Sequence, residues 1–187
     1  MTTEQEDTVS SAETVQIGKS LIEILSPDGK LSLIQFTPKD AQEIFELIDR
    51  NREHLSQNNE DTAKKYPTLE SVEESILHPT NPNRLRFAIR DSQGVFLGSI
   101  NLTPEKDNPQ KGEIGYYLGK EATGKGYATQ AVNLLTDYAF DKLNYQELYG
   151  IVAITNDPSK KVLQKAGYEE TGTEFSLFTK RKPIKPS

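Results

Sequence analysis

Apolar and polar residues alternate in some stretches of the chain and recur every three or four residues in others. Alternation, or a short run rich in β-branched and aromatic residues, predicts a strand, whereas a period near 3.6 predicts a helix. Strands are expected at 21–25, 31–36, 85–91, 95–103, 113–118, 147–154, 168–174 and 175–179. From apolar faces, capping residues and prolines, helices are expected to begin at Thr37, Pro67, Tyr127 and Asp157. The polar segment 56–66 receives no assignment.

This order of elements predicts an α/β (α+β) protein, with a mixed sheet at the centre and helices on both of its faces. The 187 residues suit one domain, which we place at 17–180. Residues 1–16 are acidic and carry few apolar side chains, so they are expected to be disordered. Residues 181–187 form a basic tail that contains prolines.

Composition narrows the classes of function. A net charge of −6 without a basic stripe argues against nucleic acid as a partner. The chain has no cysteine and two histidines, so no metal site is expected. Neither a signal peptide nor an apolar run long enough to cross a membrane is visible, which predicts a cytoplasmic protein that does not contact a membrane. We expect a monomer or a homodimer.

The stretch 113–129 reads as a strand, a loop with Gly124 and Gly126, and the start of the longest helix. Such a loop directs backbone N–H groups and the positive end of a helix dipole at one point, which favours a phosphate. A Walker A loop would need serine or threonine where Gly126 stands, and a dinucleotide-binding loop would need glycine or alanine in place of Thr129. Glycines that merely turn the chain remain the alternative.

Three segments together resemble a known family. The loop 121–126, Glu-Ala-Thr-Gly-Lys-Gly, resembles the acetyl-CoA loop of the GNAT N-acetyltransferases, Gln/Arg-x-x-Gly-x-Gly/Ala, although Glu121 departs from its first position. The segment 47–55 resembles the first-helix segment of the ribosomal-protein (RimJ/RimL-like) branch. Asn156-x-x-Ser159 and the Leu-Gln-Lys-Ala-Gly-Tyr run of 163–168 resemble a later motif of that branch. The resemblance spans about 31–172.

The resemblance implies a mostly antiparallel sheet in which the strands that begin near Glu113 and Glu147 splay apart, with the pantetheine of acetyl-CoA in the gap. Its pyrophosphate would meet backbone N–H groups of Gly124, Lys125, Gly126, Tyr127 and Ala128. Thr129 would add a hydroxyl, and a backbone N–H near Tyr117 and Leu118 would hold the thioester oxygen. Asn156 would bind the amides of the cofactor, unless it only turns the chain.

The implied reaction is transfer of the acetyl group to an amine by direct attack in a ternary complex. The branch suggests a protein N-terminal α-amine, and polyamines or small amines stay open as acceptors. Glu113 is the first candidate for the general base and His54 the second; a strand-end carboxylate at the surface is the alternative for Glu113. Many family members protonate the thiolate with a tyrosine at the position of Leu163, and Ser159 is the candidate that remains. The rival interpretation is a catalytically inactive module that binds acyl-CoA or a protein.

Overall fold

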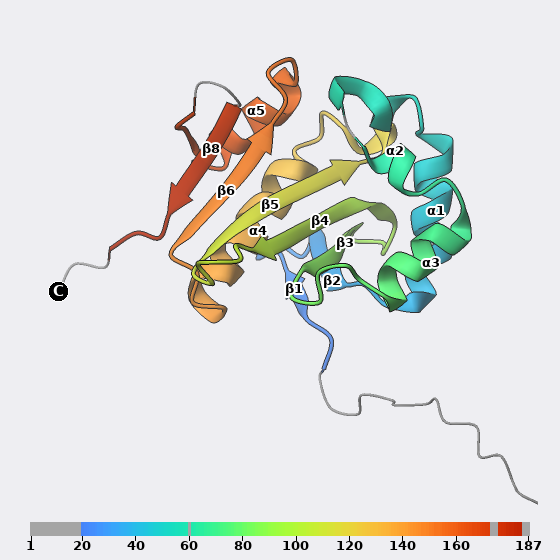
Figure 1. Ribbon diagram of the computed structural model, residues 1–187, viewed down its shortest axis with the longest axis horizontal. Helices are drawn as coiled ribbons and strands as arrows, with labels where there is room; N and C mark the ends of the chain where they lie inside the picture. The colour runs from blue at the N-terminus through green and yellow to red at the C-terminus, as the bar shows by residue number, and fades with distance from the viewer. Residues whose placement is uncertain (1–19, 60, 173–175, 185–187) are drawn as a thin grey trace, which may run out of the picture.

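The computed structural model describes residues 20–59, 61–172 and 176–184. One sheet forms the centre, with the strand order β1-β2-β3-β4-β5-β6-β8-β7 (Figure 1). The strands are β1 (Glu23–Leu25), β2 (Leu31–Gln35), β3 (Leu85–Asp91), β4 (Phe96–Pro104), β5 (Lys111–Leu118), β6 (Glu147–Val152), β7 (Glu169–Glu170) and β8 (Ser176–Arg181). Every neighbouring pair is antiparallel except β5 with β6. The expected mixed, mostly antiparallel sheet is confirmed.

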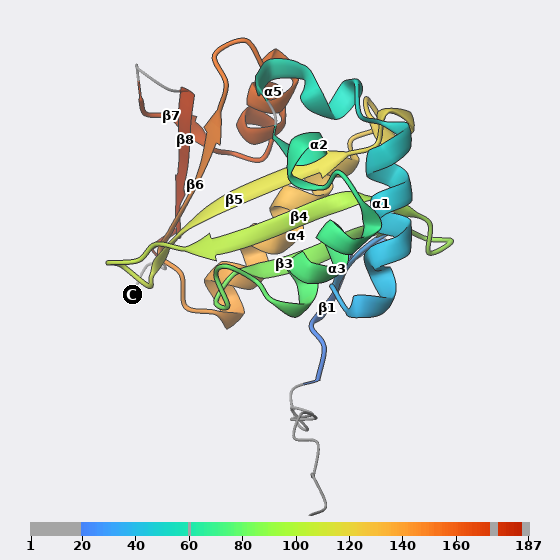
Figure 2. The same cartoon turned by 45° about the vertical axis from the view of Figure 1, so that its right-hand side comes forward.

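Helices cover both faces of this sheet, as expected (Figures 1 and 2). The helices are α1 (Ala41–Arg50), α2 (Thr62–Lys65), α3 (Leu69–Leu77), α4 (Tyr127–Lys142) and α5 (Asp157–Lys165). Short 3-10 turns are η1 (Pro38–Asp40), η2 (His54–Asn59) and η3 (Lys120–Ala122). Helices α1, α2 and α3 lie on one face and α4 and α5 on the other. Among the described residues, no helix is long and apolar enough to span a membrane.

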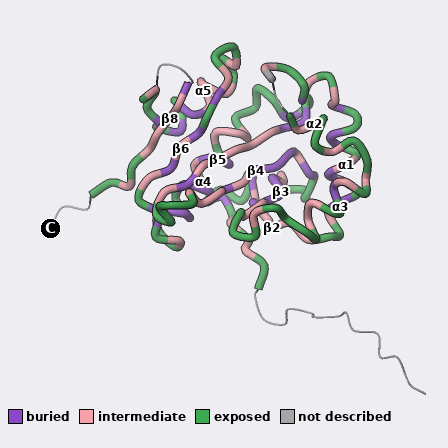
Figure 3. Tube along the Cα trace, in the orientation of Figure 1, coloured by how far each residue is buried: buried purple, intermediate pink, exposed green. Residues whose placement is uncertain are grey.

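The buried residues lie mainly in the strands and helices (Figure 3). Their side chains form two cores. On β3, Phe87 and Ile89 belong to the larger core, whereas Ala88 between them belongs to the smaller core. Helix α4 adds Val132 and Leu135 to the larger core, and both side chains are fully buried. Side chains along a strand alternate between the two faces of the sheet. The strand residues that alternate with those of the larger core therefore point to the face covered by α1–α3.

The strands β5 and β6 pair over three positions only, Lys111 with Glu147, Gly112 with Leu148 and Glu113 with Tyr149. Beyond Glu113 the two strands diverge, although β5 continues to Leu118. The expected splayed pair is thus present, and Glu113 lies at its apex. Backbone N–H groups on the open edge of β5 have no strand partner there.

Local differences from the expected elements have simple causes. Pro38 lies in η1 rather than in α1, and Thr37 with Asp40 forms a capping box around this turn. Helix α2 lies in the segment 56–66, which received no assignment. The reason is that its four residues are too few to show a helical period in the sequence. The last strand extends to Arg181, while the expected break at 174–175 and the segment 1–16 fall outside the described residues.

Candidate active site

The cofactor-loop candidate leads from β5 into α4 through two glycines in the left-handed conformation. Gly124 has φ +73° and Gly126 has φ +83°, a region that side chains other than glycine rarely adopt. Gly126 is the N-cap of α4, and no side chain caps the helix there. The first N–H groups of this 16-residue helix consequently lack an intrahelical acceptor and carry the positive end of its dipole. This arrangement suits an anion such as a diphosphate.

Asn51 holds the start of this loop against α1. Its side chain is buried, accepts a hydrogen bond from the Lys120 N–H at 2.9 Å, and donates to the Leu47 carbonyl at 2.9 Å. Sequence reasoning placed Asn51 in a family segment but gave it no function. Both hydrogen-bonding groups of the Asn51 amide are thus used to fix the approach to the loop.

A cleft of about 370 Å³ runs from the loop into the space between the end of β5 and α5. This volume lies within the roughly 300–1,000 Å³ typical of small-molecule sites. The cleft brings together most of the predicted site residues: His54, Tyr117, Leu118, Gly124, Gly126, Tyr127, Ala128, Thr129, Asn156 and Ser159. Lys125 is exposed and does not line the cleft.

The N-terminus of α5 forms the opposite wall. The Asn156 side-chain oxygen accepts a hydrogen bond from the Ser159 N–H at 3.1 Å and so caps this helix. This capping agrees with the alternative interpretation of Asn156 as a turn residue, although the residue also lines the cleft. The Ser159 hydroxyl lies 2.8 Å from the Tyr116 phenol, which reaches across from β5.

A second, polar pocket of about 240 Å³ is lined by α2, by the strands β4, β5 and β6, and by Ser159 and Leu163 of α5. Its wall includes Glu113, which is half-buried, together with Asn101 on β4 and Arg84, which directly precedes β3. Arg84 donates from Nε to the Asn101 side-chain oxygen at 3.1 Å, and Asn101 donates to the Gly115 carbonyl at 2.9 Å. The two candidates for the base are therefore separated, with Glu113 in the polar pocket and His54 in the cleft.

The cleft and the polar pocket share three lining residues, Tyr116, Tyr117 and Ser159. Burial raises the pKa of Tyr117 well above its ordinary value, so its phenol stays protonated at neutral pH. Sequence reasoning missed Tyr116 as a hydrogen-bonding group at this junction, although it directly precedes a predicted site residue. Within the described ranges, no three metal-binding side chains lie close enough to form a metal site.

Comparison with known proteins agrees with this geometry. The family model described as an acetyltransferase (GNAT) domain matches residues 30–169. YdaF of Bacillus subtilis, provisionally named a ribosomal N-acetyltransferase, is 28% identical over 152 residues, which cover 72% of this chain and 75% of YdaF. The spermidine N(1)-acetyltransferase of Vibrio cholerae is 27% identical, with 67% of this chain and 71% of that protein covered.

A solved structure of Mycobacterium smegmatis RimJ in complex with CoA-disulfide has a similar fold, with a TM-score of 0.69 and 20% identity over 86% of each chain. The family match covers most of the described fold, including both splayed strands and the glycine loop. The chain therefore belongs to the GNAT family of acetyl-CoA-dependent N-acetyltransferases.

Proposed function

We propose that this protein transfers the acetyl group of acetyl-CoA directly to a protein N-terminal α-amine that enters through the polar pocket. The main support is the wall that the cleft and the polar pocket share, because it allows a thioester on one side to meet an amine on the other. Holding both reactants at such a junction supplies much of the rate of a bimolecular reaction. The provisional name of YdaF, a ribosomal N-acetyltransferase, supports an acceptor that belongs to the ribosome.

Each part of the site has a separate task in this proposal. The loop N–H groups of 124–128 and the Thr129 hydroxyl bind the diphosphate, and Asn156 contacts the pantetheine amides. An N–H on the open edge of β5, near Tyr117 and Leu118, polarises the thioester carbonyl. Glu113 takes the proton from the attacking amine, directly or through a water molecule.

Tyr116 is our candidate for the role that many family members give to a tyrosine at the position of Leu163. Its phenol and the Ser159 hydroxyl are hydrogen-bonded at the junction of the two cavities. We assign to Tyr116 the transfer of a proton to the sulfur that leaves the acetyl group, with Ser159 orienting its hydroxyl. The bond from the carbonyl carbon to sulfur breaks, and the sulfur gains the proton.

The function is tested by incubating the full chain with acetyl-CoA and a panel of amines, basic peptides and N-terminal peptides, while thiol release and peptide mass are followed. We expect thiol release that depends on the amine, with one acetyl group added at the N-terminal nitrogen of a peptide. Tight binding of acetyl-CoA with no thiol release across the whole panel would instead support the non-catalytic module.

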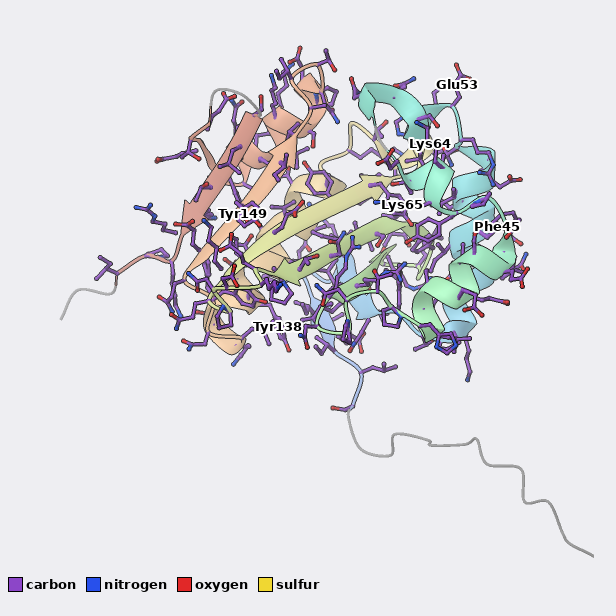
Figure 4. The ribbon with its side chains drawn as sticks, viewed as in Figure 1. Phe45, Glu53, Lys64, Lys65, Tyr138 and Tyr149 are labelled. Carbon is purple, nitrogen blue, oxygen red and sulfur yellow. The ribbon has the colours of Figure 1, made fainter. Side chains whose placement is uncertain are left out.

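Replacing Tyr116 with phenylalanine removes the hydroxyl and keeps the ring. We expect kcat to fall about tenfold, less than the roughly 10²–10⁴-fold typical of acid–base catalysis, because a thiolate is already a good leaving group. The acetyl-CoA Kd and the melting temperature should stay near the wild-type values. Tyr138→Phe on α4, away from the site in Figure 4, is the matched control. An unchanged kcat in Tyr116→Phe would remove this residue from the mechanism.

A further inference from the structure

The polar pocket carries more positive than negative side chains, and one of them has spare hydrogen-bonding groups. Its charged lining residues are Asp61, Lys65, Arg84, Arg86 and Glu113. No ion pair involving any of these five occurs within the described parts of the chain. If Glu113 faces the attacking amine, as the proposed function requires, the three cations outnumber the one remaining carboxylate.

Arg86 is committed to the structure of the pocket wall. Its two terminal nitrogens donate to the Ser75 carbonyl at 2.8 Å, to the Ser75 hydroxyl at 3.2 Å and to the Tyr66 phenol at 3.3 Å. The guanidinium also lies over the Phe36 and Tyr66 rings, 5.1 and 6.0 Å from their centroids. These contacts hold a fixed positive charge beside the pocket.

Arg84 is held by one nitrogen only. Its Nε is bound by Asn101, which is itself anchored to β5 at Gly115, and its terminal nitrogens donate to none of the described residues. The residue is exposed, and desolvation of its guanidinium, followed by the positive charge of Arg86, lowers the pKa of Arg84. A guanidinium nevertheless stays charged at neutral pH. A positioned guanidinium with two free NH₂ groups is a receptor for a carboxylate.

Three residues that follow one another across the sheet indicate how an acceptor would lie in the polar pocket. Arg84 precedes β3, Asn101 lies on β4 and Glu113 lies on β5, and all three line one pocket. Lys65 adds a further positive charge from α2, next to β5 in Figure 4. An acceptor with its amine at Glu113 would therefore present its remaining groups to Arg84 and Lys65. A polyamine would place an additional ammonium group against these cations, which is unfavourable.

From this arrangement we propose that the acceptor carries a carboxylate close to its reactive amine, and that Arg84 binds this carboxylate. The inference rests on the proposed function, since it assigns the amine to Glu113. The carboxylate has two chemical sources, an acidic side chain near the N-terminus of a peptide or the carboxylate of a free amino acid. The pocket thus selects against spermidine, the substrate named for the Vibrio cholerae relative.

The test compares C-terminally amidated peptides that differ in one charge, Ala-Asp-Ala, Ala-Asn-Ala and Ala-Lys-Ala, together with free aspartate and spermidine. With the wild-type chain, kcat/KM for Ala-Asp-Ala or for free aspartate should exceed that for Ala-Asn-Ala by about tenfold or more, the range of one charge-assisted hydrogen bond. Whichever of the two is preferred identifies the source of the carboxylate. Arg84→Gln should abolish the preference, so that kcat/KM for Ala-Asp-Ala falls to the value for Ala-Asn-Ala measured with the same variant. Arg50→Gln, an exposed arginine at the end of α1, is the matched control.

Two results would overturn this inference. One is a wild-type chain that acetylates Ala-Asn-Ala, Ala-Lys-Ala or spermidine as efficiently as the acidic acceptors. The other is a preference for acidic acceptors that survives Arg84→Gln. Either result leaves the acetyltransferase function intact, because transfer itself is still observed.

A binding measurement decides the matter without turnover. Acetylated Ala-Asp-Ala and acetylated Ala-Asn-Ala are titrated into the CoA-loaded protein. Tighter binding of the acidic peptide to the wild-type chain, lost in Arg84→Gln, supports the carboxylate site even if no acceptor is acetylated. Equal binding of the two peptides to the wild-type chain overturns it.

Discussion

Glu113→Gln is expected to reduce kcat for acetyl transfer by about 10²–10³-fold, the range typical of losing a general base. The side chain lies at the apex of the splayed strands and lines the polar pocket, which is the proposed entrance for the amine. Glutamine keeps the size and most hydrogen bonds of glutamate but cannot accept the amine proton. Because Glu113 does not line the cleft, the acetyl-CoA Kd should change little. Steady-state kinetics and calorimetry measure these two quantities separately.

A second glutamate separates the loss of a base from the loss of a negative charge at the surface. Glu53→Gln, a carboxylate that points outward after α1 in Figure 4, is the matched control and should behave as wild type. If Glu113→Gln retains full turnover, this base is wrong, and His54 in the cleft becomes the candidate.

The glycine-bearing loop between a strand and a helix could be predicted because its signal is local. Two glycines beside a helix start within 17 residues specify both the left-handed turns and the exposed N–H groups, and the structure has both. The order of elements was predictable for the same reason, since each period is read within a short window. The helix α2 lacks such a window and was not predicted.

The acceptor side could not be predicted because it depends on strand register. Arg84, Asn101 and Gly115 are joined by hydrogen bonds only after β3, β4 and β5 pair in one particular alignment. The contact of Tyr116 with Ser159 similarly joins residues 43 positions apart. A sequence pattern shows which side chains of one strand point to the same face of the sheet. It does not show which residues of the neighbouring strands lie beside them on that face.

Gly126→Val is expected to raise the acetyl-CoA Kd by about tenfold or more, the cost of losing one or two hydrogen bonds to a charged group. A Cβ built at Gly126 meets no described atom within 4 Å, so the valine side chain would extend into open space beside the cleft. There it would keep phosphate oxygens away from the N–H groups at the start of α4. Valine also disfavours the left-handed conformation, which the loop needs to direct those groups.

A control has to separate the backbone strain caused by Gly126→Val from its effect on acetyl-CoA binding. The chain offers a second glycine in a closely similar conformation for this purpose. Gly94, in the turn between β3 and β4, has φ +79° and likewise no described atom within 4 Å of an added Cβ. Gly94→Val should therefore lose a similar free energy of unfolding, about 1–2 kcal/mol for a left-handed residue with a side chain. Its acetyl-CoA Kd should remain that of the wild type. Unchanged binding in Gly126→Val, or equal weakening in both variants, would show that these N–H groups do not hold the diphosphate.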